Sequence, residues 1–172
     1  MIKKFKFIYI FLLLIFISKT AYSLEPNIFV QSTVNRASQI LSSDITKSEK
    51  IEKLKIIATD TVDIKGIGFY TLGKFRKKLN DAEKKEYTKL FREYFLKSFS
   101  SRLAEYTNPK IDVQSQEKLN DKYTIVSSVL VATDTRPEIK IQWRVFTKDP
   151  DRPLIRDLII EGLSLARTQK EE

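Results

Sequence analysis

The spacing of apolar residues changes at Pro109, about two thirds of the way along the chain, and this change constrains the fold more than any other feature. Before Pro109, apolar residues recur at every third or fourth position, as on one face of an α-helix. After it they alternate, as in a strand with one buried face. Helices followed by a run of strands predict an α+β fold, with N-terminal helices packed on one C-terminal antiparallel sheet.

Two helices are expected in the first part of the chain, over residues 26–43 and 46–62. A proline opens the first helix, where its missing N–H is not needed for an intrahelical hydrogen bond. The second begins with Thr46, which is spaced from Glu49 as in a capping box. Apolar residues of both helices fall on one face, so both need a sheet or further helices to cover them.

The longest helix is expected over residues 80–106, which contain neither Gly nor Pro. Asn80 is suited to its N-cap, with Glu83 three residues later, and Asn108-Pro109 ends it. One face of this helix is apolar, and an apolar face of this kind usually packs into an ordinary hydrophobic core. The residues at helical spacing are Tyr87, Leu90, Phe91, Tyr94, Phe95, Phe99, Leu103 and Tyr106.

The segment before this helix, residues 63–73, is interrupted by glycines. Short helical turns are therefore expected there rather than one helix. Gly66-Ile67-Gly68 is interpreted as a helix break, because a dinucleotide-binding fingerprint needs a third glycine and a preceding strand. A basic run with Phe75 inside it follows, and it is either a solvated face or a docking patch for an acidic partner or anionic lipid head groups. Its cations are Lys74, Arg76, Lys77 and Lys78.

Four strands are expected after Pro109, over residues 111–114, 123–133, 139–146 and 154–160. The third is the clearest, because its apolar and polar residues alternate strictly. The connections are short, whereas a parallel pair needs a crossover of roughly a dozen residues or more. Consecutive strands are therefore expected to pair antiparallel.

Residues 1–23 have the three parts of a secretory signal peptide in the required order. Lysines at positions 3, 4 and 6 precede an apolar run over residues 7–17, and Ala21 and Ser23 occupy the −3 and −1 positions of a cut before Leu24. The apolar run spans about 16 Å of helix, roughly half of the hydrocarbon core, which disfavours an uncleaved anchor. We expect residues 24–172 to form one domain in the periplasm of a Gram-negative bacterium.

The composition excludes several kinds of chemistry. The chain has no His and no Cys, which excludes a Ser-His-Asp triad, a thiolate nucleophile, a disulfide and the common zinc sites. Four of the 31 basic residues lie in the signal segment, which leaves 27 against 22 acidic ones and a net charge of +5. Because export accompanies this modest charge, nucleic acid is not an expected partner. Neither a metal nor a cofactor is expected.

Catalysis by carboxylates or serine alone stays open but is disfavoured. Acidic residues lie close together at Asp60 and Asp63, at positions 149 and 151, and at Asp157 and Glu161, and surface charge or helix capping explains them without acid–base chemistry. Ser164 lacks the Gly-x-Ser-x-Gly frame and any histidine to activate it. We interpret Ser164 as a helix N-cap, and we expect the protein not to be an enzyme.

The order of several short motifs resembles the MlaC family, also called the toluene-tolerance Ttg2 auxiliary proteins. The most specific stretch is residues 156–165, Arg-Asp-Leu-Ile-Ile-Glu-Gly-Leu-Ser-Leu, which is similar to the family's Asp-Val-x-Val-Glu-Gly-Val-Ser-Leu. Phe75 and Leu154 stand where the family usually has Trp. The other matching stretches are Phe29-Val30, Val62-Asp63-Ile64, residues 71–76 (Thr-Leu-Gly-Lys-Phe-Arg), and Phe91-x-x-Tyr94-Phe95 with Tyr106.

The resemblance implies a periplasmic phospholipid carrier that moves lipid between the outer and inner membranes and maintains outer-membrane lipid asymmetry. Its implied partners are phospholipid, an inner-membrane ATP-binding-cassette (ABC) transporter with an MCE-domain subunit, and an outer-membrane lipoprotein–porin complex. It also implies a cone-shaped, NTF2-like fold around an apolar cavity. Family members normally continue for some twenty residues after the Ser-Leu-x-x-x-x-x segment and form a closing helix. We expect this helix to be missing here, because the sequence stops at Lys170-Glu171-Glu172.

The resemblance also suggests which residues contact lipid. Acyl tails are expected between the sheet face that carries Trp143 and the aromatic face of the longest helix, with the basic run at the head group or a partner. A periplasmic NTF2-like module for another apolar small molecule remains the alternative. The expected lipid-binding residues are Phe69, Leu72, Phe75, Phe91, Phe95, Phe99, Val129, Val131, Trp143 and Val145.

Overall fold

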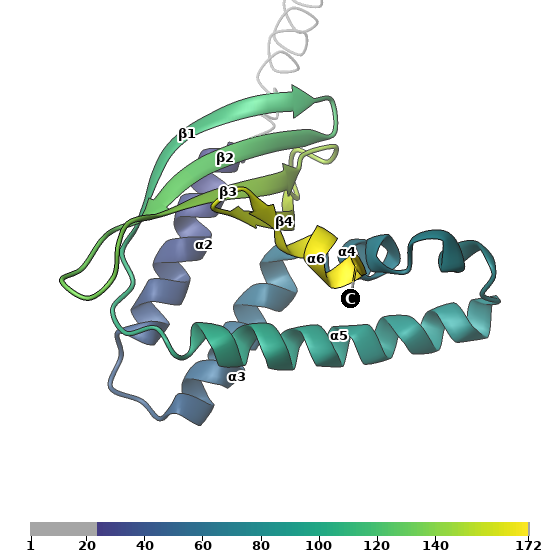
Figure 1. Ribbon diagram of the computed structural model, residues 1–172, viewed down its shortest axis with the longest axis horizontal. Helices are drawn as coiled ribbons and strands as arrows, with labels where there is room; N and C mark the ends of the chain where they lie inside the picture. Colours follow the sequence, from purple (N-terminus) through teal and green to yellow (C-terminus); the bar gives the residue numbers. More distant parts are fainter. Residues whose placement is uncertain (1–23, 172) are drawn as a thin grey trace, which may run out of the picture.

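The computed structural model describes residues 24–171, and the expected signal peptide lies outside this range. Helices come first and an antiparallel sheet follows, so the α+β fold is confirmed (Figure 1). None of the helices in this range is both long and apolar enough to cross a bilayer. In chain order the elements are α2 (Pro26–Leu41), α3 (Lys47–Thr61), α4 (Ile64–Thr71), the 3-10 helix η1 (Gly73–Lys77), α5 (Asp81–Leu103), β1 (Ile111–Asn120), β2 (Tyr123–Leu130), β3 (Ile139–Phe146), β4 (Leu154–Ile160), β5 (Leu163–Ser164) and α6 (Leu165–Glu171).

Both expected capping boxes are present. The backbone N–H of Thr46 donates to the Glu49 carboxylate at 2.9 Å, and the Glu49 N–H donates to Thr46 Oγ1 at 3.2 Å. Hydrogen bonds from the Thr46 hydroxyl and then from its backbone N–H lower the pKa of Glu49, because they stabilise the carboxylate. Asn80 and Glu83 form the same arrangement at the start of α5.

The expectation of short turns over residues 63–73 is wrong for most of that segment, because α4 is one continuous α-helix. Asp63 starts it by accepting a hydrogen bond from the N–H of Gly66 at 2.8 Å. Gly68 lets α5 approach closely, since a Cβ atom there would lie 2.8 Å from Cδ1 of Phe91. The glycines of α4 therefore serve packing, and the helix breaks only at Gly73, whose φ is 52°.

The sheet is an antiparallel meander in the order β1-β2-β3-β4-β5. Strand β1 extends to Asn120, beyond the expected residues 111–114, because its polar second half is held by pairing with β2 although it carries no apolar alternation. Strand β5 was not expected; it follows Gly162, whose φ of 84° suits glycine, and pairs with the end of β4.

Two apolar clusters, with Val62 packed against both, stabilise the fold. The first joins α2, through Phe29 and Val30, to one face of the sheet. The second joins α4, α5 and α6 around Ile67 and Phe91. Helix α5 packs on α3 and α4 rather than on the sheet (Figure 1). Several members of its expected apolar face are consequently exposed, namely Leu90, Tyr94 and, beyond the end of the helix, Tyr106.

Candidate functional site

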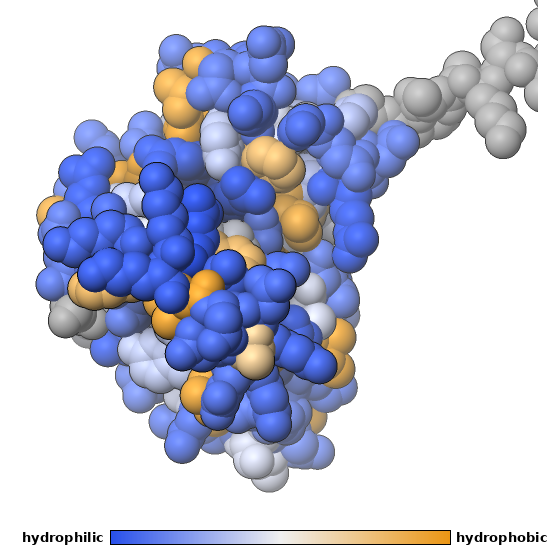
Figure 2. Space-filling view, turned by 90° about the vertical axis from the view of Figure 1, so that its right-hand side faces the viewer, coloured by the Kyte–Doolittle hydropathy of each residue, from blue (hydrophilic) through white to orange (hydrophobic). Residues whose placement is uncertain are grey.

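A recess of about 460 Å³ opens where α4 and α6 meet the sheet. Figure 2 views the molecule from the side of α4 and η1, where small apolar patches lie among hydrophilic residues. The recess differs from the expected apolar cavity, because its lining mixes charged, aromatic and aliphatic side chains. The lining residues are Gly66, Ile67, Tyr70, Arg76, Leu119, Tyr123, Arg144, Arg156, Asp157 and Ala166.

Strand geometry decides which side chains of the sheet reach the recess. Successive residues of a strand point to opposite faces, so Arg144 points away from the core that holds its neighbours Trp143 and Val145. The register between β3 and β4 shifts beside Arg144, and Arg156 is the extra residue on β4. Such a bulge redirects side chains, and here Arg156 and Asp157 both line the recess.

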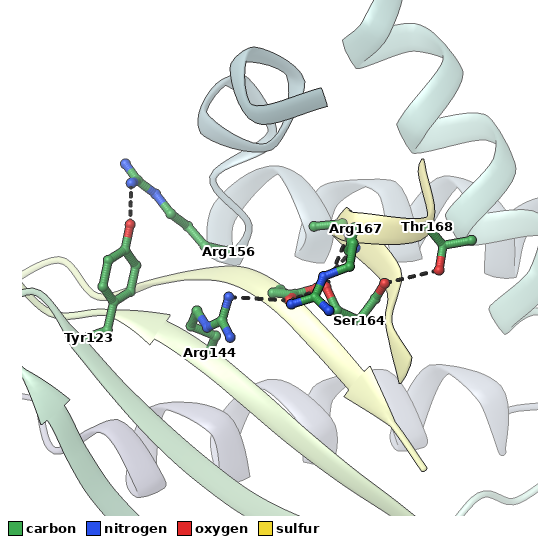
Figure 3. A network of polar contacts seen from close by, with 8 residues as sticks. Tyr123, Arg144, Arg156, Ser164, Arg167 and Thr168 are labelled. Carbon is green, nitrogen blue, oxygen red and sulfur yellow. Dashed lines mark hydrogen bonds and ion pairs between the residues drawn. The ribbon is translucent and has the colours of Figure 1, made fainter. Parts of the chain in front are cut away.

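Arg156 forms a fixed wall of the recess. Its Nε donates to Asp63 Oδ2 at 2.6 Å. Its Nη1 donates to the Tyr123 hydroxyl at 2.7 Å, the contact that Figure 3 shows. Its guanidinium lies 4.0 Å from the ring centroid of Phe146. Desolvation by burial lowers the pKa of Arg156, but the hydrogen bonds to Asp63 and Tyr123 outweigh it, so the net pKa is raised. Arg156 is therefore a permanent cation in the recess wall.

Asp157 also lines the recess and is only 4% exposed. Its carboxylate accepts hydrogen bonds from the Ser164 hydroxyl at 2.6 Å and from the Ala166 N–H at 3.0 Å, and it lies 3.6 Å from Arg144 Nη1. Ser164 Oγ in turn accepts from the Arg167 N–H at 3.1 Å, which confirms that Ser164 caps the last helix (Figure 3). The carboxylate thus fastens α6 to β4.

The contacts of Asp157 and Ser164 support a structural role for these residues better than a catalytic one. Both oxygens of Asp157 already accept hydrogen bonds, and Ser164 donates its proton to a carboxylate that is also paired with Arg144. Within residues 24–171 no group of three or more acidic residues is placed to hold a metal ion. Of the acidic pairs noted in the sequence, Asp63 and Asp157 act as caps, as expected, while the burial of Asp157 was not expected.

None of the ten expected lipid-binding residues lines the recess. Trp143 and Val145 pack with α2 in the first cluster, and Trp143 Nε1 donates to Ser128 Oγ at 2.8 Å. The expected arrangement, with Trp143 facing the aromatic side of α5, is wrong, because α5 belongs to the second cluster. Strand β3 turns these side chains towards α2, which covers that face of the sheet.

The other expected residues occupy several environments. Phe91 is buried in the second cluster, and Phe95 packs against it, with Phe99 stacked 5.3 Å from Phe95 between ring centroids. Val129 is buried in the sheet, and Phe75 is exposed on η1. Half-buried positions are occupied by Phe69, Leu72 and Val131.

Two members of the recess lining also belong to the second cluster, Ile67 of α4 and Ala166 of α6. The floor of the recess is therefore the outer surface of the core that contains Phe91, with Phe95 packed against it. Of the basic run, Arg76 reaches the recess, while the other three cations lie exposed beside it on and after η1.

Sequence reasoning missed most of the residues that line the recess. Strand alternation already implied that Arg144 points away from Trp143, but it did not reveal what lies on that face. Arg156 and Asp157 stand in the most specific motif of the sequence, yet only the folded chain shows that they meet Tyr123 and Ser164.

Comparison with known proteins places this geometry in a family context. A family model described as MlaC protein matches residues 31–172. A solved structure of a phospholipid-binding protein from Ralstonia solanacearum, in complex with a phospholipid, is similar with a TM-score of 0.71 and 16% sequence identity. The match covers 86% of this chain and 84% of that chain. At this level of identity the likeness shows a shared fold.

Proposed function

The chain belongs to the MlaC family, and on that basis we propose that it binds phospholipid and carries it through an aqueous compartment. The observation that supports this most directly is the family match over residues 31–172. The fold shared with a protein solved in complex with a phospholipid supports the same conclusion.

A carrier is physically necessary for such cargo. Two acyl chains contain about 30 methylenes, and at about 0.8 kcal/mol per CH₂ their exposure to water costs on the order of 20 kcal/mol. Free diffusion of a phospholipid through water is therefore negligible. A protein that covers the tails removes most of this cost.

We propose that the recess holds the part of the lipid where the polar head group joins the apolar tails. Its volume of about 460 Å³ lies within the range of small-molecule pockets, roughly 300 to 1,000 Å³. Arg76 and Tyr70 at its wall suit the phosphate of a head group, since guanidinium pairs with phosphate in a bidentate manner. The tails would pass Ile67 and Ala166 into the second cluster, towards Phe91 and Phe95.

This route requires α6 to move away from α4 and α5. Helix α6 has only seven residues and contributes Ala166 to the cluster, so its displacement exposes little core. Insertion of tails there would bring lipid against the expected residues Phe91, Phe95 and Phe99. Trp143 and Val145 would remain in the core beside α2.

Membership of the family also supports a wider role. We propose that the protein works in the periplasm, exchanges lipid with an inner-membrane ABC transporter carrying an MCE-domain subunit and with an outer-membrane lipoprotein–porin complex, and thereby maintains lipid asymmetry. No catalytic step is part of this role.

Native mass spectrometry of the protein purified from cells tests the proposal. We expect a mass increment equal to one diacyl phospholipid, released by organic extraction and identified by its fragments. An isoprenoid or another apolar ligand in its place would favour the alternative binding module. Hydrolysis of lipid esters by the wild type, and its loss in Asp157→Asn or Ser164→Ala, would instead indicate an enzyme.

A further inference from the structure

The 3-10 helix η1 carries an aromatic ring among cations. Phe75 is 55% exposed, and the Nζ atoms of Lys74 and Lys78 each lie 5.7 Å from the centroid of its ring. An exposed phenylalanine costs solvation free energy unless something covers it. The residues around Phe75 indicate what kind of surface covers it.

Within the described part of the chain, the cations beside Phe75 form no salt bridge. Among residues 24–171, salt bridges join other lysines and arginines to acids, but none of them involves a cation of this patch, made of Lys74, Arg76, Lys77 and Lys78. Lys170 of α6 adds a further positive charge nearby, since its Cε lies 3.2 Å from the place of a Cβ at Gly73. The patch therefore presents uncompensated positive charge around an apolar ring.

The patch is continuous with the recess, because Arg76 belongs to both. Tyr70, another lining residue, has the Nζ of Lys170 at 5.2 Å from its ring centroid. A surface that covers Phe75 would thus lie directly against the mouth of the recess.

An anionic bilayer matches these features better than an acidic protein surface does. Basic residues are attracted to anionic lipids, each strengthening binding by about fivefold near the surface. Aromatic and aliphatic side chains enter the boundary between head groups and acyl chains, while lysine and arginine remain at the phosphates. An acidic protein would satisfy the four charges but would leave Phe75 facing carboxylates.

We infer that η1 is a membrane-contact element, in which the patch binds the head groups of anionic phospholipids while Phe75 enters the interface. The contact places the mouth of the recess against the bilayer. This inference goes beyond the carrier function, which requires only that lipid be bound, and the two can fail separately.

Vesicle flotation tests the inference with the chain over residues 24–172. Vesicles of phosphatidylcholine alone are compared with vesicles containing phosphatidylglycerol, at 0.1 M and 1 M NaCl. We expect binding to the anionic vesicles at low salt and its loss at 1 M, where the Debye length falls from about 10 Å to about 3 Å. Equal binding to both vesicle types, or no binding to either, overturns the inference.

A matched pair of charge variants locates the contact. The patch variant carries Gln at positions 74, 77 and 78 and keeps Arg76, which lines the recess, and we expect its binding to vesicles to fall at least tenfold. The control replaces three lysines that are exposed, make no salt bridge among the described residues and lie outside the patch: Lys53, Lys110 and Lys140. An equal loss in both variants would show that only net charge matters and would overturn the inference.

A second pair tests the apolar part. Phe75→Ala is compared with Ile56→Ala, because Ile56 is 61% exposed but lies on α3. We expect several-fold weaker vesicle binding for Phe75→Ala alone, and equal binding of the two variants contradicts insertion of Phe75. Circular dichroism and thermal unfolding confirm that all variants fold. Phospholipid that still co-purifies with the patch variant keeps the carrier function separate from the membrane contact.

Discussion

Arg156 donates a hydrogen bond from Nε to Asp63 Oδ2 at 2.6 Å, and this contact joins residues that are 93 positions apart. It holds the beginning of α4 against β4, beside a parallel bridge between Val62 and Ile155. The pair is partly buried, with 31% of the Arg156 side chain and 16% of the Asp63 side chain exposed. One wall of the recess therefore depends on an ion pair between the helical part and the sheet.

Removing the charge of Asp63 should destabilise the fold without uncapping α4. Asparagine still accepts the hydrogen bond from Gly66, since it is as good an N-cap as aspartate. We therefore expect Asp63→Asn to lower the free energy of unfolding by about 2 kcal/mol, as for a hydrogen bond to a charged group. Urea denaturation measures this value, and Asp63→Ala should lose about 1 kcal/mol more because the cap is also lost.

A double-mutant cycle with Arg156→Gln separates the pair from other effects. A coupling energy of about 1 kcal/mol or more is expected, because the two side chains share one hydrogen bond. Additive losses from the two substitutions would show that the contact contributes nothing to stability.

Asp157→Asn should loosen α6. The asparagine amide replaces one carboxylate oxygen by a hydrogen-bond donor. The side chain can then no longer accept hydrogen bonds from both the Ser164 hydroxyl and the Ala166 N–H. We expect a loss of about 3 kcal/mol, as when one partner of a buried pair is removed, and faster amide hydrogen exchange at Ala166 and Arg167. Asp149→Asn, at an exposed position, is the control. Unchanged protection of the α6 amides would contradict the anchoring role.

Gly68→Ala should destabilise the protein although alanine favours helices. At an exposed helical site this change stabilises by up to about 1 kcal/mol, but here the new Cβ would lie 2.8 Å from Phe91 Cδ1. We expect a loss of about 1–3 kcal/mol from overpacking. Replacing the facing ring by a smaller side chain, through Phe91→Leu, should recover part of the lost unfolding free energy in the double variant. If Gly68→Ala is stabilising by itself, the close packing of α4 on α5 is wrong.

Phe95→Asp should abolish lipid retention. Phe95 packs on the second cluster behind the recess, and a carboxylate there would have to be desolvated against acyl chains. Leu90→Asp is the matched control, because Leu90 lies on the same helix but is 55% exposed. Native mass spectrometry of the two variants measures the fraction that carries lipid. A folded Phe95→Asp protein with a normal lipid fraction would exclude this cluster as the site of the tails.

Acidification should weaken the start of α3. The pKa of Glu49 is lowered from 4.5 by its hydrogen bonds to Thr46. A carboxylate with a depressed pKa in the folded state contributes stability above its unfolded value, and this contribution disappears as pH falls through the folded pKa. The difference in unfolding free energy between the wild type and Glu49→Gln should therefore shrink as pH falls from 7 to below 4.5.

Local signals identified most elements correctly. Thr46 with Glu49 and Asn80 with Glu83 predicted both capping boxes, because capping depends on residues within one turn. Strict alternation over residues 139–146 predicted β3, because this signal also depends only on residues that are close in the sequence. The polar half of β1 and the continuity of α4 through Gly66 and Gly68 were missed, because a partner strand and the facing Phe91 maintain them.

The sequence by itself determined the order of helices and strands, their caps and the face of β3 that carries Trp143. Those properties depend on neighbours along the chain. Only the tertiary structure decided that α2, and not α5, covers Trp143, and that Arg144, Arg156 and Asp157 surround a recess with Tyr70 and Ile67. Contacts between distant segments are set by how several faces pack at once, and no local pattern records which faces meet.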